Sequence, residues 1–474
     1  MNSISAAEPH AAVAEREPPK LIRGLTLTDT ILLLVGGSVG SGVFLTARDI
    51  AGNVSHPAIF LLVWVAGAVI TLFACFACAE LGTMFPEAGG QYVYVREAFG
   101  DLVAFLYGWM IFAVMMGGGN ATISMGFAHY FSALVPALGG DRVLMRIGGW
   151  QLTGLHLIAI SANALITWVN MIGLRKAVTL QNVANWMKFA AIAAFVVLGF
   201  AIGKGSWSHF TAASVAALPS MGMWPALSRF GVALIAVFWA YDGWEFVSWA
   251  AGEVKDPRRN LPRALLVGVI CVAAIYISMN AAYLYALPLR GIAEGEETTA
   301  RAAAVALFSP AIGQWLSALI ALSCFGALSC STLSGARVHY AMAKDGLFFK
   351  SVAKVHPKWH TPVNSLILQF IWSAILTLTG RYEQLFTYTM FMTVLGYTFT
   401  VAGLFALRWK RPNAERPYRC TGYPALPGLY VIVTAIWALN VVWQRPVESL
   451  AGIGIVALGI PGYLYWRRNR AVAQ

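Results

Sequence analysis

The sequence predicts an all-α polytopic membrane protein, and three observations support this fold class. Of its 474 residues, 58% are hydrophobic and only 11% are charged, whereas soluble chains carry about 25% charged residues. The mean hydropathy is +0.66. The apolar residues gather in twelve segments, most of which reach the roughly 20 residues that a helix needs to cross a bilayer. We therefore expect twelve transmembrane helices in contact with lipid.

The elements follow one another from a polar N-terminal tail, 1–24, which contains proline and lacks the apolar stretch of a signal peptide. The predicted transmembrane segments are, in order, 26–52, 57–84, 98–134, 152–173, 178–203, 229–252, 262–288, 311–343, 362–380, 383–408, 428–444 and 448–466. A short polar tail, 468–474, ends the chain.

The net charge of +12 is distributed unevenly between the two sides of the predicted membrane region. The loops on the side of the N-terminal tail contain 23 of the 33 lysines and arginines, those on the other side contain 9, and Lys188 lies inside a segment. Positively charged loops stay in the cytoplasm, so we expect both termini there. The basicity then reflects topology, and no nucleic-acid partner is predicted.

Cysteine usage predicts neither a disulfide framework nor a metal site. Five of the six cysteines lie in apolar segments. Cys75 and Cys78 have metal-like spacing, but they lie within a predicted helix with no second pair nearby, so buried small side chains are the simpler interpretation. We also find no nucleophile–base pair and no Walker sequence. We therefore predict no metal, no cofactor and no enzymatic activity.

The first apolar segment contains a predicted break at residues 36–42, Gly-Gly-Ser-Val-Gly-Ser-Gly. Each of its four glycines costs a helix about 1 kcal/mol relative to alanine. A simple glycine contact between helices would need only two of them on one face. Backbone freed from helical bonding at membrane depth must be buried in protein or line a wet cavity. We expect the helix to be interrupted there.

The sixth segment contains a second predicted break, where Asp242 and Gly243 interrupt the apolar run from Phe238 to Trp244. Asp242 has two interpretations that the sequence leaves open. Its side chain could cap a restarted helix, or it could take part directly in function. Either interpretation requires helix six to be discontinuous.

The positions of the two breaks indicate an internal repeat. They fall in the first helix of each of two five-helix units, 25–203 and 204–408, and 409–467 adds a cytoplasmic loop and two further helices. Because five is odd, the second unit enters the membrane from the opposite side, which gives a 5+5 inverted repeat. Interrupted segments at matching positions indicate the central site of a transporter.

Six short motifs occur in order along nearly the whole chain. They are Gly36-x-x-x-Gly40-Ser41-Gly42-Val43-Phe44, Pro86-Glu87-Ala88-Gly89-Gly90-Gln91-Tyr92-Val93-Tyr94 with Arg96-Glu97-Ala98-Phe99-Gly100, Ala240-Tyr241-Asp242-Gly243-Trp244, Glu253-Val254-Lys255-Asp256-Pro257-Arg258-Arg259-Asn260-Leu261-Pro262, Ala336-Arg337 through Tyr340-Ala341-Met342-Ala343-Lys344-Asp345-Gly346, and Arg416-Pro417-Tyr418 with Gly422-Tyr423-Pro424. Together they resemble the amino acid–polyamine–organocation (APC) superfamily, and most closely its L-type amino acid transporter branch with its bacterial relatives.

This resemblance implies a LeuT-like fold and alternating-access transport of amino acids across the bacterial inner membrane, a plasma membrane. The chain departs from the family at Trp239, where many relatives have Phe, at Glu245, where many have Asn, and at Gly252, where Glu is common. The first two departures bear on the choice of substrate side chain. Animal relatives use a cysteine after helix three to bind a heavy chain; the loop 135–151 has none, so no disulfide-linked partner is expected.

The breaks suit an amino acid zwitterion. Unpaired N–H groups at the restart of helix one favour a carboxylate, and carbonyls at the end of the first half of helix six accept from an ammonium group. We expect Trp239 to act as a gate over the substrate. The predicted substrate-binding residues are Ser38, Val39, Gly40, Ser41, Gly42, Val43, Phe238, Trp239, Ala240 and Tyr241.

Three charged residues outside the breaks have predicted roles. Lys188 lies about eleven residues, or roughly 16 Å, into its segment, too deep to reach water easily. With Gln181 and Asn182 it resembles a helix-five pattern in which a lysine ammonium takes the place of sodium. It is therefore predicted to be a tether to helix one or a proton-coupling group. Glu80 and Glu253 lie at cytoplasmic helix ends, where they either pair with basic residues or are simply solvated.

The leading functional hypothesis is a secondary transporter of neutral L-amino acids, either an exchanger or a proton-linked symporter. Asp242 and Glu245 keep a cationic amino acid or polyamine exchanger as the alternative. A non-transporting amino acid sensor is a third possibility, which the short termini disfavour.

Overall fold

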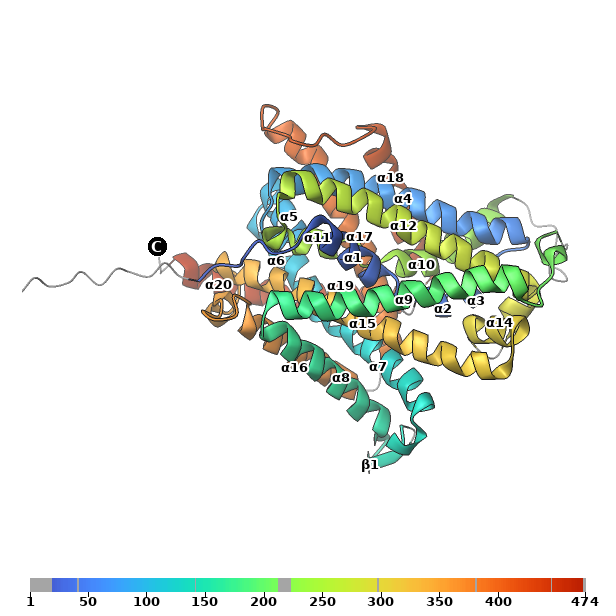
Figure 1. Cartoon of the computed structure of the whole chain (residues 1–474). Coiled ribbons are helices and arrows are strands. Elements are labelled where there is room, and N and C mark those ends of the chain that lie inside the picture. Colours follow the sequence, from blue (N-terminus) through green and yellow to red (C-terminus); the bar gives the residue numbers. More distant parts are fainter. Residues whose placement is uncertain are drawn as a thin grey trace, which may run out of the picture.

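The computed structural model describes residues 19–40, 42–140, 142–211, 223–295, 298–379, 382–444 and 446–471. Helices that cross the molecule in roughly one direction make up nearly all of it, and α20 lies at one end near the C-terminus (Figure 1). We call this end the basic end. It contains the ion pairs of Arg337 with Glu253 and of Arg408 with Glu80. The opposite end contains α3 and α14.

The predicted segments correspond to helices in the same order. The first five are α1 (Leu27–Ser38) with α2 (Gly42–Leu45) and α3 (Ala47–Gly52), α4 (Pro57–Met84), α6 (Asp101–Met110) with η1 (Ile111–Met116) and α7 (Gly117–Leu134), α8 (Gly154–Met171), and α9 (Leu174–Ile202). The next five are α10 (Met223–Tyr241) with α11 (Phe246–Trp249), α12 (Pro257–Ala286), α15 (Pro310–Lys344), α16 (Val363–Leu378), and α17 (Tyr382–Lys410). The last two are α18 (Ala425–Gln444), and α19 (Pro446–Ala457) with α20 (Gly459–Ala471).

Within the described residues, eleven helical stretches are long and apolar enough to cross a membrane. The exception among the predicted segments is α16, which has 16 residues and falls short of that length. The helices that correspond to predicted segments one and six are interrupted, as a LeuT-like fold requires. The chain is thus an all-α polytopic membrane protein.

Several elements between the spans were not predicted. They are α5 (Gln91–Phe99), η2 (Pro136–Leu138), the antiparallel hairpin of β1 (Val143–Ile147) and β2 (Trp150–Thr153), η3 (Trp207–Phe210), η4 (Ala251–Glu253), α13 (Leu289–Glu294), α14 (Thr299–Leu307) and η5 (Lys350–Ala353). The last predicted segment is also divided, since α19 and α20 meet at Leu458. These elements are short and lie at the ends of the bundle or between spans.

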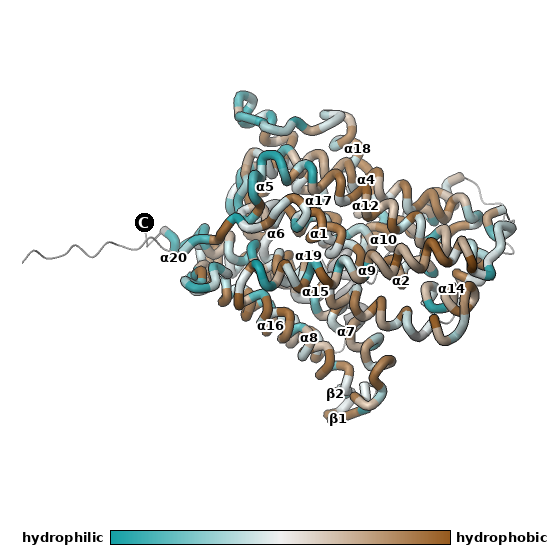
Figure 2. Tube along the Cα trace, in the orientation of Figure 1, coloured by the Kyte–Doolittle hydropathy of each residue, from teal (hydrophilic) through white to brown (hydrophobic). Residues whose placement is uncertain are grey.

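The apolar surface indicates which side chains face lipid. Large side chains such as Trp315, Trp443 and Ile202 are 75%, 86% and 71% exposed, which a soluble protein of this size would not tolerate over its whole flank. Hydrophobic residues run along the helices, and hydrophilic ones gather at their ends (Figure 2). Many polar side chains are instead buried inside the bundle. The interior is therefore where the functional groups lie.

Candidate functional site

The interruption of the first span exposes backbone carbonyls in the centre of the bundle. Helix α1 starts at a capping box formed by Thr26 and Asp29 and ends at Ser38. The N–H of Gly40 donates to the Ser38 carbonyl at 2.7 Å instead of continuing the helix, so the carbonyl of Gly36 loses its usual partner. Helix α2 restarts at Gly42. Side chains from other helices must therefore satisfy the freed carbonyls.

Lys188 of α9 supplies two of these contacts. Its Nζ donates to the carbonyl of Gly36 at 3.0 Å and to that of Val39 at 2.6 Å. The side chain is completely buried, and its ammonium also lies 5.3 Å from the centre of the Phe189 ring. Lys188 thus connects helix five to the carbonyls of the first interruption. Its role, as a tether or as a proton-coupling group, stays a prediction.

Two further side chains contribute hydrogen bonds to the carbonyls of the first interruption. The hydroxyl of Ser323 in α15 donates to Val39 and Gly40, at 2.8 and 3.1 Å. The hydroxyl of Tyr276 in α12 lies 2.6 Å from the carbonyl oxygen of Ser38. Sequence reasoning missed both residues, because a single hydroxyl in an apolar segment is a weak signal.

The second interruption lies directly against the first. Helix α10 ends at Tyr241 and α11 restarts at Phe246. Gly243 has a φ of +105°, and a side-chain carbon built there would lie 2.8 Å from backbone atoms of Gly37 and Ser38. The two unwound stretches are therefore in backbone contact, and only glycine fits at this position.

The Tyr276 hydroxyl connects the two interruptions. It lies 2.6 Å from the carbonyl oxygens of both Ser38 and Ala240. The Ser38 hydroxyl adds a longer contact of 3.5 Å to the Tyr241 carbonyl. One side chain from α12 thus bridges backbone groups that are about 200 residues apart in the sequence.

Two carboxyl groups lie beside the second interruption. Asp242 accepts a hydrogen bond from the Tyr397 hydroxyl of α17 at 2.5 Å, and Glu245 accepts from the N–H of Gly243 at 3.0 Å. Glu245 is completely buried, and its second oxygen has no partner within the described part of the chain. Neither carboxylate forms an ion pair with the described lysines and arginines.

The predicted cap role of Asp242 is wrong. The position that precedes α11 is Glu245, and its side chain does not cap the helix. Asp242 instead turns away from α11 toward Tyr397, because the left-handed Gly243 lies between Asp242 and the helix start. The alternative interpretation of Asp242, a direct role in function, stays a prediction.

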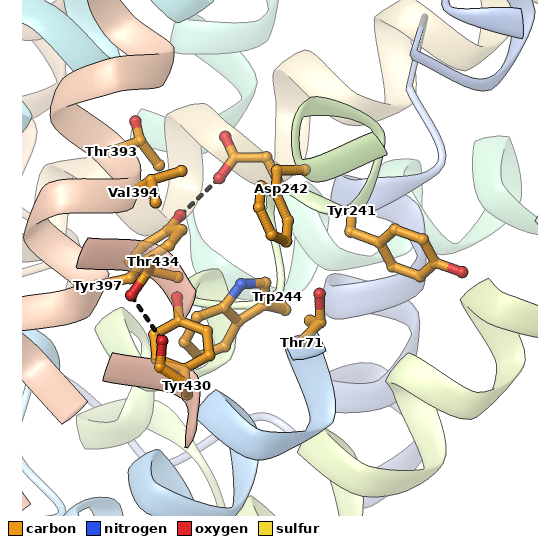
Figure 3. Close-up of a pocket in the computed structure, with 10 residues that line it drawn as sticks. Thr71, Tyr241, Asp242, Trp244, Thr393, Val394, Tyr397, Tyr430 and Thr434 are labelled. Carbon is orange, nitrogen blue, oxygen red and sulfur yellow. Dashed lines mark hydrogen bonds between the residues drawn. The ribbon is translucent and has the colours of Figure 1, made fainter. Parts of the chain in front are cut away.

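A small cavity lies beside Asp242, between α4, α10, α17 and α18 (Figure 3). It encloses about 20 Å³, room for roughly one water molecule. Its polar walls include Asp242, Tyr397 and Thr71. The Phe238 side chain also lines this cavity and lies 6.1 Å from the Trp437 ring.

The predicted substrate-binding residues occupy different places. Gly42 lies against Ala240, and a side-chain carbon built on Gly42 would lie 3.4 Å from Trp239. The hydroxyl of Tyr241 donates to the Trp64 carbonyl of α4, so the side chains of Tyr241 and Phe238 lie on the α4 side of α10. These two residues offer only backbone groups to the junction. Ser41 lies outside the described residues.

At the basic end, a buried ion pair joins the exit of the second interruption to α15. Arg337 donates to both carboxylate oxygens of Glu253, at 2.6 and 3.0 Å, and both side chains are at most 1% exposed. The backbone of Leu25 bonds to Glu253 and Lys255, each at 2.9 Å. The start of the first span is thereby fastened to the exit of the sixth. Of the two roles that the sequence left open for Glu253, pairing or solvation, the structure shows pairing.

Glu80 forms a second cluster at the basic end, at the end of α4. Its carboxylate accepts from Arg408 at 2.6 and 3.0 Å, and Arg416 lies 3.0 Å away. The N–H of Cys420 donates to it at 2.6 Å. Glu80 is therefore also paired and not solvated. Burial and the nearby Glu80 carboxylate raise the pKa of the Cys420 thiol to about 12.

The described residues contain no group of three His, Cys, Asp or Glu side chains that could hold a metal ion. What the interruptions offer instead is backbone: N–H groups at the start of α2 beside carbonyls at the end of α10. A small molecule with a carboxylate and an ammonium group matches both ends.

Comparison with known proteins places this geometry in context. The sequence model of a family described as amino acid permease matches residues 25–455. The chain is 29% identical over 445 residues to the human large neutral amino acids transporter small subunit 2, covering 92% of this chain and 79% of that protein. It is 29% identical over 462 residues to the mouse Asc-type amino acid transporter 1, covering 94% and 82%. It is 30% identical over 455 residues to the serine/threonine exchanger SteT of Bacillus subtilis (strain 168), covering 95% and 98%.

Proposed function

The chain belongs to the amino acid permease family, and from this premise we propose that it exchanges neutral L-amino acids across a membrane by alternating access. It is an amino acid transporter and not an enzyme. The proposed substrate class and the exchange mode draw on its relatives, which are named as transporters of large neutral amino acids and as an exchanger of serine and threonine.

The observation that carries this proposal is the backbone contact between the two interruptions. The first N–H groups of α2 have no helical acceptor, and the positive end of its dipole favours a carboxylate. The last carbonyls of α10, from Phe238 to Ala240, would accept from an ammonium group. The Ala240 carbonyl also lies 2.6 Å from the Tyr276 hydroxyl, and its second lone pair would serve the substrate. Since Gly42 packs directly on Ala240, both ends of a zwitterion can be held within one small volume.

We propose that Trp239 covers this volume as a gate. Its ring lies beside Gly42, at the start of α2. A rotation of the ring would open or close access to the N–H groups without any change in the backbone. The indole would also shape the space left for the substrate side chain.

Lys188 is proposed to be a tether that keeps the first span unwound. The side chain satisfies two carbonyls of the first interruption. Leaving such a carbonyl unpaired in an apolar interior would cost about 1–3 kcal/mol for each group. The two contacts of Lys188 and its complete burial support this role. In an exchanger, such a charge would stay in place throughout the cycle.

A cationic amino acid or polyamine is the second candidate substrate, and one observation favours it. Asp242 and Glu245 place two carboxyl groups beside the second interruption with no described lysine or arginine paired to them. A substrate ammonium could balance their charge, and one oxygen of Glu245 has no hydrogen-bond partner among the described residues. Replacing both by amides should then abolish uptake of lysine and arginine while leaving neutral substrates unaffected.

The topology is part of the proposal. The excess of lysine and arginine at the basic end supports a cytoplasmic location for that end and for both termini, in a bacterial inner membrane. The two interrupted spans support an inverted repeat of 25–203 and 204–408. We also propose that the chain works without a disulfide-linked heavy chain, since the loop 135–151 contains no cysteine.

The test uses purified protein in liposomes without an ion gradient. Vesicles are either empty or preloaded with unlabelled serine, threonine and leucine, and uptake of the labelled forms is measured. We expect uptake only into preloaded vesicles. Equal uptake into both would contradict exchange, and no uptake into either would contradict the neutral substrate class.

A pair of glycine variants tests whether the junction of α2 and α10 is the site. In Gly42→Ala the new methyl group would lie 2.8 Å from the Ala240 backbone, whereas Gly231→Ala in the same α10 meets no atom within 4 Å. We expect Gly42→Ala to lose uptake and Gly231→Ala to retain it. Equal activity of the two variants would place the substrate elsewhere.

A further inference from the structure

A groove opens at the basic end, far from the two interruptions. It lies between the end of α15, the turn that follows it, and the end of α20, and it encloses about 530 Å³. Gly346, which has a φ of +74°, forms part of its floor and lies against the aliphatic part of Arg470. The groove is thus about 25 times larger than the cavity beside Asp242, and the function proposed above makes no use of it.

The groove has an excess of positive charge. Lys344, Lys350 and Arg470 line it, and the lysines are exposed. Its one lining carboxylate, Asp345, is already neutralised, because it accepts hydrogen bonds from Arg96 and from Tyr92. Arg470 is only partly compensated, by an ion pair of 3.0 Å with Asp101 in which both side chains are about 40% exposed. Among the described residues, neither lysine forms an ion pair, so both present positive charge to the groove.

The other wall of the groove is aromatic. Phe348, Phe349 and Trp466 pack together with ring centres 5.0 to 5.3 Å apart, and Tyr465 completes the wall. Phe349 is 50% exposed and Tyr465 is 63% exposed. The wall is therefore accessible to an apolar group and not only to water.

The position of the groove fixes its depth in the membrane. Two spans, Pro310–Lys344 and Ser449–Arg470, end at its rim. Hydrophobic helices give way there to hydrophilic residues around α20 (Figure 2). Helix ends that carry aromatic and basic residues lie at the level of the lipid headgroups. A ligand of this groove thus has to be polar and anionic at one end and apolar at the other.

We propose that this groove binds an anionic glycerophospholipid. The phosphate lies between Lys344, Lys350 and Arg470, and the glycerol and the first acyl carbons lie against Phe349, Tyr465 and Trp466. Charge complementarity supports this occupant, since basic pockets between transmembrane helices suit anionic headgroups. A zwitterionic lipid would bring a choline cation to a site that already has an excess of positive charge.

The test is a lipid titration of the full-length protein in detergent, followed by native mass spectrometry. Phosphatidylglycerol and phosphatidylcholine with identical acyl chains are compared for wild type, for Lys344→Gln/Lys350→Gln, and for the control Lys176→Gln/Arg259→Gln. The control removes two exposed charges of the same sign outside the groove. Glycerol phosphate, which lacks acyl chains, separates a lipid site from a site for a soluble anion.

One surface charge contributes about 1 kcal/mol, or roughly five-fold in affinity. We therefore expect wild type and control to prefer phosphatidylglycerol, and the groove variant to bind it about 25-fold more weakly. Tyr465→Ala should weaken both lipids equally. Equal affinity for the two lipids in wild type, or equal losses in the groove variant and the control, would overturn the proposal. Glycerol phosphate that displaces phosphatidylglycerol at equal concentration would show a soluble-anion site instead.

Discussion

Replacing Lys188 by methionine removes a charge but keeps a long flexible side chain in the middle of α9. In the native protein the ammonium donates to the carbonyls of Gly36 and Val39, at 3.0 and 2.6 Å. Hydrogen bonds from a charged donor contribute about 1.5–3 kcal/mol each, so the two bonds together contribute about 3–6 kcal/mol. Ser323 still donates to Val39 in the variant, and this places the expected loss near the lower end, about 3 kcal/mol.

This loss of free energy destabilises the unwound conformation of the first span. An unpaired Gly36 carbonyl in an apolar interior favours a return to regular helix, which would remove the N–H groups proposed to bind the carboxylate. Because 1.4 kcal/mol corresponds to a factor of ten, about 3 kcal/mol predicts a roughly 100-fold fall in exchange rate at equal protein abundance.

The assay is counterflow of labelled threonine in liposomes, together with thermal unfolding of the purified variants. Lys204→Met is the matched control, since Lys204 lies just beyond the end of α9 and is exposed. We expect Lys204→Met to match wild type in both measurements. If Lys188→Met exchanged threonine within two-fold of wild type and unfolded at the same temperature, the tether argument would be refuted.

Three further perturbations have defined outcomes. Arg337→Gln leaves the completely buried Glu253 carboxylate unpaired and should destabilise the protein by about 3–5 kcal/mol. The double variant with Glu253→Gln should recover more than half of this loss in thermal unfolding. Equal losses of stability in the single and the double variant would contradict a buried ion pair. Gly243→Ala would collide with the backbone of the first interruption and should abolish exchange, whereas Gly231→Ala, with no atom within 4 Å, should be active. The pKa of Cys420 is raised to about 12, so its reactive thiolate is rarer below that pH than in the unfolded chain. Alkylation by iodoacetamide at pH 8 should be at least about ten-fold slower in the folded protein and accelerate up to about pH 12, as peptide mass spectrometry would show; equal rates in folded and unfolded protein would contradict this.

The spans could be predicted from the sequence because lipid imposes a simple rule on composition. A run of apolar residues near 20 in length has few alternatives to a transmembrane helix, and α4 begins and ends at the predicted residues 57 and 84. The shorter elements follow a weaker rule. The β1–β2 hairpin and α5 lie outside the spans, where turn geometry and local packing decide the structure. The division of α19 from α20 was missed although Gly459, Pro461 and Gly462 follow directly after Leu458, because glycine and proline are also tolerated within transmembrane helices.

The candidate site could be predicted only where backbone conformation is encoded locally. A glycine-rich stretch predicted the first interruption, and Asp242 with Gly243 predicted the second. The charge of Lys188 inside an apolar segment predicted a buried partner. The partner of Asp242 was not predictable, because Tyr397 is 155 residues away and is one of 17 tyrosines. The same holds for Tyr276, whose hydroxyl reaches across to Ser38, 238 residues away. Contacts over such distances depend on the assembled bundle.

The hydrogen bonds to the carbonyls of the first interruption also set an order of events during synthesis. The carbonyl of Val39 accepts a hydrogen bond from Ser323, which is 284 residues further along the chain. At a synthesis rate of 5–20 residues per second, Ser323 is added roughly 15–60 s after Val39. Lys188, which donates to the carbonyls of Gly36 and Val39, is synthesised 152 and 149 residues after them. The nascent first span therefore begins without these partners, and it enters the bilayer most favourably as one straight helix. Its unwinding is therefore a late maturation step, completed only when helices from the second half of the chain arrive.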